Sequence, residues 1–155
     1  MTQPDRFEEA KEARRIVGSN SSYTIQTRGL IPDQWSEWEY HKVEGVVSND
    51  VYGVSHSFAK GPKFDYLCGL PVEDDAPVPE GQSEIVIPAG TYAVYVHDGH
   101  ISSLSSLFDA IICGDAPKRG WTFGAGPQFE LYGDEFDGST STGKVELWFP
   151  IIRIS

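Results

Sequence analysis

Basic residues and cysteines are scarce in this sequence. Against 23 Asp and Glu residues there are 12 Lys and Arg, so the formal net charge at pH 7 is -11. An acidic field of this size repels phosphate backbones and attracts cations, which argues against direct nucleic-acid binding. The two cysteines, Cys68 and Cys113, lie in apolar contexts, where buried thiols are commoner than disulfides. We therefore expect both to be free thiols.

Long hydrophobic runs and cofactor motifs are missing too. No apolar stretch approaches the roughly 20 residues of a transmembrane helix, and the N-terminus carries charges before any apolar block, unlike a secretory signal. We expect a cytoplasmic protein without membrane association. The glycine-rich stretch 120–126 lacks the Lys-Ser/Thr ending of a phosphate loop, and His97 and His100 have no third metal ligand at a suitable spacing. We therefore expect no cofactor and no metal.

The length of 155 residues fits one domain with its own hydrophobic core. We place that domain at residues 15–155 and predict that residues 1–14 are an N-terminal helical extension. The extension rests on the charged stretch Gln3 to Arg15, whose apolar residues recur at helical spacing.

Within the domain, alternating and helical patterns follow in the same order twice. The first repeat covers about 15–72 and the second about 83–155, with an acidic, proline-rich linker at 73–82. The first repeat is predicted to contain a strand at 16–27 interrupted near Gly18, a helix at 32–43 with Trp35 and Trp38 on its inner face, and a hairpin of strands 50–58 and 64–72. The second is predicted to contain a strand at 83–96 with a bulge or edge position at 88–90, a helix at 102–113, a loop at 117–126, and a hairpin of strands 129–132 and 145–150. The predicted class is α+β, a duplicated β-α-β-β unit with a ligand cleft between its halves.

Each strand of the last predicted hairpin carries one glutamate among apolar residues. Glu130 shares a strand face with Tyr132, and Glu146 shares one with Trp148. On an open face of the sheet these carboxylates are merely hydrated. In a cavity each requires a cation, a proton or a dense set of hydrogen bonds, because removing a charge from water is costly.

Five motifs occur in order along the chain. They are Val51-Tyr52-Gly53-Val54, Phe64-x-Tyr66-x-Cys68-Gly69, Ile87-Pro88-Ala89-Gly90-x-Tyr92-Ala93-Val94, Pro127-x-Phe129-Glu130-x-Tyr132 and Val145-Glu146-x-x-x-Pro150-Ile151. This series resembles the gyrase-inhibitor-like (GyrI-like) effector-binding domains, which occur fused to AraC-type and MerR-type transcription regulators and also alone. The resemblance runs from about Arg15 to Ile154. It implies pseudo-two-fold symmetry and a central cavity, in which members from multidrug regulators bind lipophilic organic cations with buried acids and aromatics.

The family's two glutamates match Glu130 and Glu146, motif for motif. We hypothesise that both carboxylates point into one aromatic-walled cavity and attract a lipophilic, cationic small molecule, with the chain acting as a sensor or sequestering module. Aromatic faces there supply apolar area and cation-π contacts worth about 0.5 to 2 kcal/mol each. The candidate ligand-binding residues are Glu130, Glu146, Trp35, Trp38, Tyr66, Trp148, Tyr52 and Phe58. We assign no catalytic residue.

Two other functions stay open from the sequence. Some GyrI-like proteins are hydrolases, which would make Glu130 or Glu146 a general base with a raised pKa. Others protect gyrase, which leaves open a protein-binding role in which the acidic surface mimics DNA. The 14 or so residues before the domain do not hold a helix-turn-helix, so transcription regulation by this chain alone is not expected. A second copy of the chain or a regulator protein is the macromolecular partner that this hypothesis allows.

Overall fold

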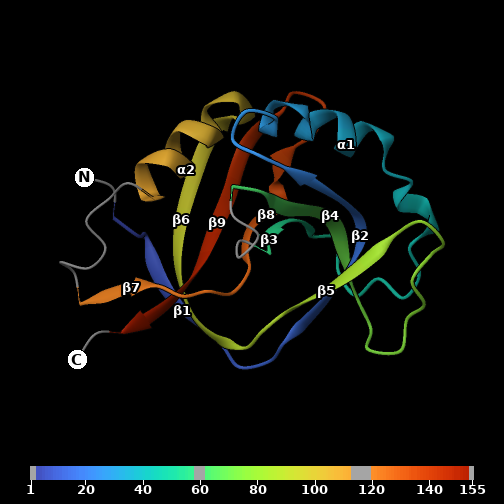
Figure 1. Ribbon diagram of the computed structural model, residues 1–155, viewed down its shortest axis with the longest axis horizontal. Helices are drawn as coiled ribbons and strands as arrows, with labels where there is room; N and C mark the ends of the chain where they lie inside the picture. The colour runs from blue at the N-terminus through green and yellow to red at the C-terminus, as the bar shows by residue number, and fades with distance from the viewer. Residues whose placement is uncertain (1–2, 58–61, 113–119, 154–155) are drawn as a thin grey trace.

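A strongly curved antiparallel sheet carries two short helices on one of its faces (Figure 1). The computed structural model describes residues 3–57, 62–112 and 120–153. Its strands are β1 (Arg6–Ala10), β2 (Arg14–Tyr23), β3 (Val51–His56), β4 (Phe64–Val72), β5 (Ser83–Ile87), β6 (Gly90–His100), β7 (Trp121–Phe123), β8 (Gln128–Asp137) and β9 (Thr142–Arg153). The helices are α1 (Ile31–Glu37) and α2 (Leu104–Ile112), accompanied by 3-10 turns at Arg28–Leu30, Tyr40–Lys42 and Ile101–Ser103.

The strand order β1-β6-β9-β8-β3-β4-β2-β5 has two matching halves that meet at the β3–β8 pair. In the first half β4 lies between β3 and β2, and in the second half β9 lies between β8 and β6. Strand β1 crosses over to pair with β6 of the second half, and β5 crosses over to pair with β2 of the first. Pro71 pairs with β2 in one half, as Pro150 pairs with β6 in the other. This arrangement confirms the α+β class and the duplicated unit.

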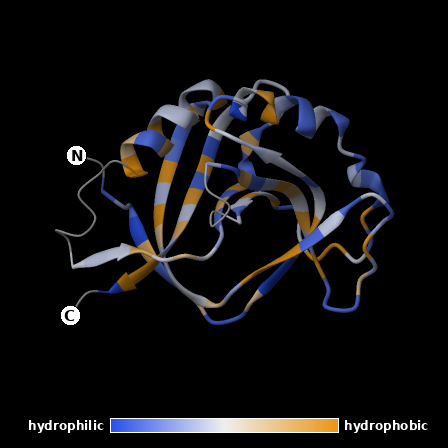
Figure 2. Cartoon of the chain, in the orientation of Figure 1, coloured by the Kyte–Doolittle hydropathy of each residue, from blue (hydrophilic) through white to orange (hydrophobic). Residues whose placement is uncertain are grey.

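The two faces of the sheet bury different hydrophobic clusters. On the helix-bearing face, α2 packs on β6 and β9 through Leu104 and Ile111, while Trp38, at the end of α1, packs among residues of β2 and β4. The opposite face buries a third cluster, which includes Tyr52, Phe129 and Trp148. Figure 2 shows hydrophobic residues along the strands and many hydrophilic ones on α1. The helices therefore cover one face in two separate places, on either side of the central strands β3 and β8.

The predicted N-terminal helix is wrong, because residues 6–10 form strand β1 and residues 14–23 form β2. Burial alternates residue by residue in β1, and every residue from Arg6 to Ala10 is paired with β6. A helix of this length is marginal in water by itself. Pairing with the edge of a distant strand supplies backbone hydrogen bonds and contacts that override the local helical pattern.

Helix α1 is shorter than predicted and ends at Glu37, so only Trp35 of the two tryptophans lies in it. Trp38 is extended, with φ -69° and ψ 126°, and its indole Nε1 donates to Oε1 of Gln82 at 3.2 Å. Residues 73–82 form no helix or strand, yet Ala76 is buried against Trp38 and Val43. The contact with this segment explains why the chain leaves the helix at Trp38.

The remaining predicted elements are mostly confirmed. Both hairpins occur, and the second is longer than expected, with a register shift between Tyr132 and Phe136. The first strand runs through Gly18 without interruption. The stretch 83–96 is two strands, since β5 pairs with β2 and β6 with β9. Part of the predicted loop 117–126 is strand β7, paired with the end of β9. In the described part of the chain, no helix is long and apolar enough to cross a membrane.

Gly18 explains how β2 continues where an interruption was predicted. It pairs directly with Gly69 of β4, and a Cβ on Gly18 would overlap the carbonyl oxygen of Cys68 and lie 2.6 Å from Cα of Gly69. The backbones approach so closely here that only glycine fits.

We predict that Gly18→Ala destabilises the fold by about 1 to 3 kcal/mol, the usual cost of forcing extra volume into a packed site. Urea unfolding measures the change. Gly138→Ala is the matched control, because a Cβ there meets no atom within 4 Å. Equal stability of the two variants would contradict the close approach of β2 and β4.

Candidate ligand-binding site

Glu130 lies at the centre of the sheet, on the face that carries the helices. It belongs to β8 and pairs with Gly53 of β3 on one side and with Leu147 of β9 on the other. Leu147 is in the cluster beneath α2, and paired residues in a sheet share a face. The carboxyl group of Glu130 is therefore directed between the two places that the helices cover.

Two tyrosine hydroxyls hold the carboxylate of Glu130. Tyr132 donates to Oε1 at 2.6 Å, and Tyr66 donates to the same oxygen at 3.0 Å. The indole Nε1 of Trp35 in turn donates to the Tyr66 hydroxyl at 3.2 Å. A chain of hydrogen bonds thus runs from α1 through β4 to the carboxylate.

Burial dominates the electrostatics of this group. Desolvation raises the pKa of Glu130, and the hydrogen bonds from Tyr132 and Tyr66 lower it only in part. Burial and the charge of Glu130 raise the pKa of both tyrosines, so their hydroxyls stay protonated and donate. Among the described residues, no basic side chain contributes to the pKa of Glu130. Within the described ranges, the carboxyl group of Glu130 therefore has no positively charged partner.

Aromatic rings surround this carboxylate. Trp35 makes edge-to-face contacts with Tyr132, at 5.5 Å between ring centroids, and with Tyr66, at 6.3 Å. Trp38 contacts Trp35 at 6.0 Å, one step further from the carboxylate. Rings of this kind offer electron-rich faces to a cation.

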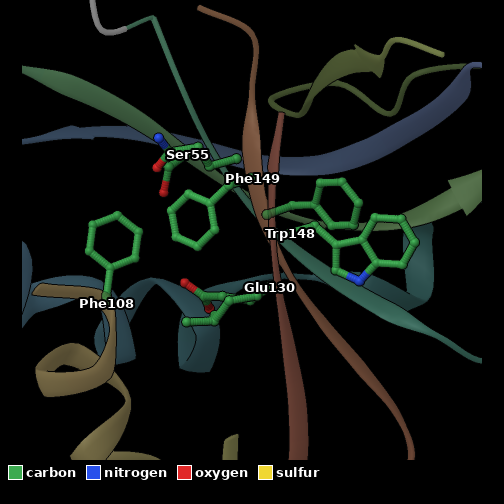
Figure 3. A pocket seen from close by; sticks show the side chains of 8 residues that line it. Ser55, Phe108, Glu130, Trp148 and Phe149 are labelled. Carbon is green, nitrogen blue, oxygen red and sulfur yellow. The ribbon is translucent and has the colours of Figure 1, made fainter. Parts of the chain in front are cut away.

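A small pocket of about 10 Å³ adjoins Glu130 (Figure 3). It is lined by Ser55, Phe108, Gln128, Phe129, Glu130, Leu147, Trp148 and Phe149. In Figure 3 the rings of Phe108 and Phe149 lie beside one another, with Glu130 nearby, while the Trp148 ring points to the other side of the strands. Since neighbouring strand residues face opposite ways, Trp148 borders the pocket with its backbone.

An ion pair joins the two halves on the same side of the sheet. The guanidinium of Arg28, just before α1, donates from both terminal nitrogens to the carboxylate of Asp109 in α2, each at 3.0 Å. This pairing lowers the pKa of Asp109 and raises that of Arg28. A bidentate salt bridge therefore links the turn before α1 to α2, the two helical segments that cover the sheet.

The prediction that Glu130 and Glu146 point into one cavity is wrong. Glu146 pairs with Leu131, so it lies on the face opposite to Glu130. Its Oε2 is 2.9 Å from the guanidinium of Arg6, and Oε1 accepts from the indole of Trp148 at 3.0 Å. The hairpin pattern could not reveal this difference, because it depends on which residues of β8 and β9 are paired. Glu130 pairs with Leu147, one residue beyond Glu146, so the two glutamates face opposite ways.

Tyr52 and Trp148 also lie on that opposite face, in the cluster with Phe129. The guanidinium of Arg14 is 5.1 Å from the Trp148 ring and 6.0 Å from the Tyr52 ring, and it donates to the Tyr52 hydroxyl at 2.8 Å. On this side the chain's own arginine occupies the aromatic surface.

Of the predicted site residues, the structure thus brings together Glu130, Tyr66 and Trp35, with Trp38 behind them. Phe58 lies outside the described residues. Sequence reasoning missed Tyr132, although its place two residues after Glu130 on one strand face indicated a contact. It also missed Phe108, Phe149, Ser55 and Gln128, which only the folded sheet and α2 bring to the pocket.

A curved sheet covered by two helices, with a desolvated carboxylate among aromatic rings between them, is typical of a small-molecule-binding α+β domain. The family model described as "GyrI-like small molecule binding domain" matches residues 6–152, and the chain belongs to this family. The match includes β1, so the first strand is part of the domain and not an extension of it.

Individual relatives agree with this assignment. The chain is 34% identical over 113 residues to "Transcriptional regulator BrlR" of Pseudomonas aeruginosa, covering 72% of this chain but 42% of the regulator. The structure of SAV2435 bound to tetraphenylphosphonium is similar with a TM-score of 0.73 at 17% identity, covering 95% of this chain and 93% of the other. A putative transcription regulation protein from Staphylococcus aureus MU50 reaches 0.70 at 16% identity, covering 97% and 99%.

Gly53 makes room for the hydrogen bond between Tyr66 and Glu130. A Cβ on Gly53 would overlap the Tyr66 hydroxyl oxygen and lie 2.9 Å from Oε1 of Glu130. We predict that Gly53→Ala destabilises the fold by about 1 to 3 kcal/mol. It also raises the pKa of Glu130 further, because the displaced hydroxyl no longer stabilises the carboxylate.

Urea unfolding and an NMR titration of the Glu130 side-chain carboxyl carbon measure these two effects. Gly133→Ala, on β8 with Glu130, is the control, since its Cβ would meet nothing closer than 3.4 Å. An unchanged pKa of Glu130 in Gly53→Ala would show that the Tyr66 hydroxyl does not act on the carboxylate.

Proposed function

We propose that this domain binds lipophilic organic cations beside Glu130, between α1 and α2. The observation that carries the proposal is the desolvated carboxylate, which has two tyrosine hydroxyls but no basic partner among the described residues. A bound cation supplies the missing charge, and an ion pair formed in a low-dielectric site is much stronger than one in water.

The ligand has to be lipophilic as well as positive. Trp35, Phe108 and Phe149 present apolar and aromatic surface on both sides of the carboxylate. Burying such surface stabilises a complex by about 25 cal/mol per Å² before the costs of association are subtracted. Flat rings also accept ligands of several shapes. The tetraphenylphosphonium bound to the similar protein SAV2435 has this combination of charge and apolar area and supports the proposal.

Binding of a large cation requires α1 and α2 to move apart. The pocket beside Glu130 has a volume of only about 10 Å³, whereas sites for drug-sized ligands have about 300 to 1,000 Å³. The Arg28–Asp109 bridge links the turn before α1 to α2, and an exposed ion pair of this kind stabilises by only about 0.2 to 1 kcal/mol. Breaking this bridge therefore adds little to the cost of opening the cleft.

The biological role that fits best is ligand sensing or sequestration. The relative in Pseudomonas aeruginosa is a transcriptional regulator, and this chain matches 42% of it. We infer that the domain serves as the ligand-sensing part of such a system, with DNA contacts made elsewhere, because its formal charge of -11 repels DNA.

Titration with tetraphenylphosphonium or rhodamine 6G, followed by tryptophan fluorescence, tests the proposal. We expect saturable quenching with micromolar affinity and at least tenfold weaker binding by Glu130→Gln, which keeps the shape but removes the charge. Glu146→Gln is the matched control, because that carboxylate faces the other side of the sheet and pairs with Arg6. Equally tight binding of anionic dyes, or full affinity of Glu130→Gln, would refute the cation site. Mass spectrometry of the recovered ligand separates binding from the hydrolase alternative, since binding leaves the ligand unchanged.

The raised pKa of Glu130 predicts a pH dependence of binding. Cation affinity should rise as the pH increases through this pKa, because only the ionised carboxylate attracts the ligand. The stability of the free protein should fall as the pH increases, since ionising a buried carboxyl group is unfavourable. The contribution of Glu130 to the free energy of unfolding is complete below its unfolded-state pKa. It is lost as the pH rises through the folded-state pKa.

Calorimetric titrations with tetraphenylphosphonium at several pH values, and urea unfolding over the same range, measure the two trends. Both should flatten in Glu130→Gln. A cation affinity independent of pH in the wild-type protein, across and above the ordinary glutamate range, would contradict the assignment of Glu130 as the charged partner.

A further inference from the structure

Gln128 presents an unused hydrogen-bond acceptor beside the proposed cation site. It lies two residues before Glu130 on β8, on the same face of the strand, and pairs directly with Ser55 of β3. Both residues line the pocket that adjoins Glu130. The amide oxygen Oε1 of Gln128 is buried and has no hydrogen-bond partner among the described residues. Buried acceptors without partners are rare in folded proteins, because desolvation without a replacement bond is costly.

Glu130 contributes a second acceptor to the same place. Both tyrosine hydroxyls donate to its Oε1, and no residue in the described part of the chain donates to Oε2. Residues two apart on a strand are separated by about 6.8 Å along it. An ammonium nitrogen that donates through two N–H bonds about 109° apart, at about 2.9 Å each, spans about 4.7 Å between its acceptors. Two side chains whose Cα atoms are about 6.8 Å apart on one strand face can converge to this span.

We infer that the site selects cations that carry N–H groups, such as protonated primary and secondary amines and amidinium groups, over quaternary ammonium and phosphonium cations of similar size. This inference rests on the proposed function and refines it. A cation without N–H groups neutralises Glu130 but leaves Oε1 of Gln128 without a donor. A protonated amine satisfies both groups while its apolar part packs on Phe108 and Phe149.

A matched pair of ligands tests this preference. 4-Phenylbenzylammonium and its N,N,N-trimethyl derivative have the same charge and aromatic body, and differ in the presence of N–H groups. Displacement of bound rhodamine 6G measures both affinities. We expect the wild-type protein to bind the primary ammonium at least fivefold more tightly.

Gln128→Met, which keeps the length of the side chain without its amide, should reduce this ratio to about twofold or less, mainly by weakening the primary ammonium. Gln26→Met is the control, because Gln26 is exposed and outside the pocket. If Gln128→Met does not fold, as judged by circular dichroism, the NMR signals of the Gln128 side-chain amide in the wild-type protein decide. They should shift with the primary ammonium and much less with the trimethyl derivative.

The failure of this inference is distinguishable from failure of the proposed function. Equal affinities of the wild-type protein for the two ligands, or a ratio unchanged by Gln128→Met, would overturn the N–H preference, and so would a primary ammonium that does not displace the dye. The proposed function survives each of these results if Glu130→Gln still weakens dye binding. Loss of that Glu130 effect overturns both.

Discussion

A desolvated carboxylate at the seam between two halves of a sheet governs the local design of this protein. Burial makes ionised Glu130 costly, and the hydroxyls of Tyr66 and Tyr132 offset part of that cost. The residues around Glu130 help to offset this cost. Gly53 leaves space for the Tyr66 hydroxyl, and Trp35 donates to that hydroxyl from α1. No described basic residue supplies a positive charge to Glu130, and this gap is the basis of the proposed binding of cations.

The duplication explains why the domain has one such carboxylate and not two. Gly53 pairs with Cys68, three residues before Pro71, and Glu130 pairs with Leu147, three residues before Pro150. Gly53 and Glu130 thus occupy equivalent positions in the two halves, and they are also directly paired across the central seam. A carboxylate at both positions would place like charges opposite each other, which is destabilising. Glycine in one half therefore gives the other half's carboxylate its space and avoids the repulsion.

The opposite face of the sheet shows the same chemistry with an internal cation. There Arg6 pairs with Glu146, and the Arg14 guanidinium lies over the rings of Trp148, Phe129 and Tyr52. A carboxylate and aromatic rings occur together on both faces, but no basic side chain of the described segments acts on the carboxylate of the helix-bearing face. This contrast makes Glu146 an internal control for the role of Glu130.

The sequence by itself determined the alternating strands of both hairpins, the helix after each first strand, and the motif series that indicates the family. These features are local patterns, and Glu130 beside Tyr132 was readable from the same two-residue period. Tertiary structure decided the rest. Residues 6–10 became a strand because the edge of β6 accepted them, and Gln128, Ser55 and Phe108 met only after three distant segments packed together. The pairing of β8 with β9 placed Glu130 and Glu146 on opposite faces, since a strand's register, which depends on its neighbours, decides which face each side chain takes.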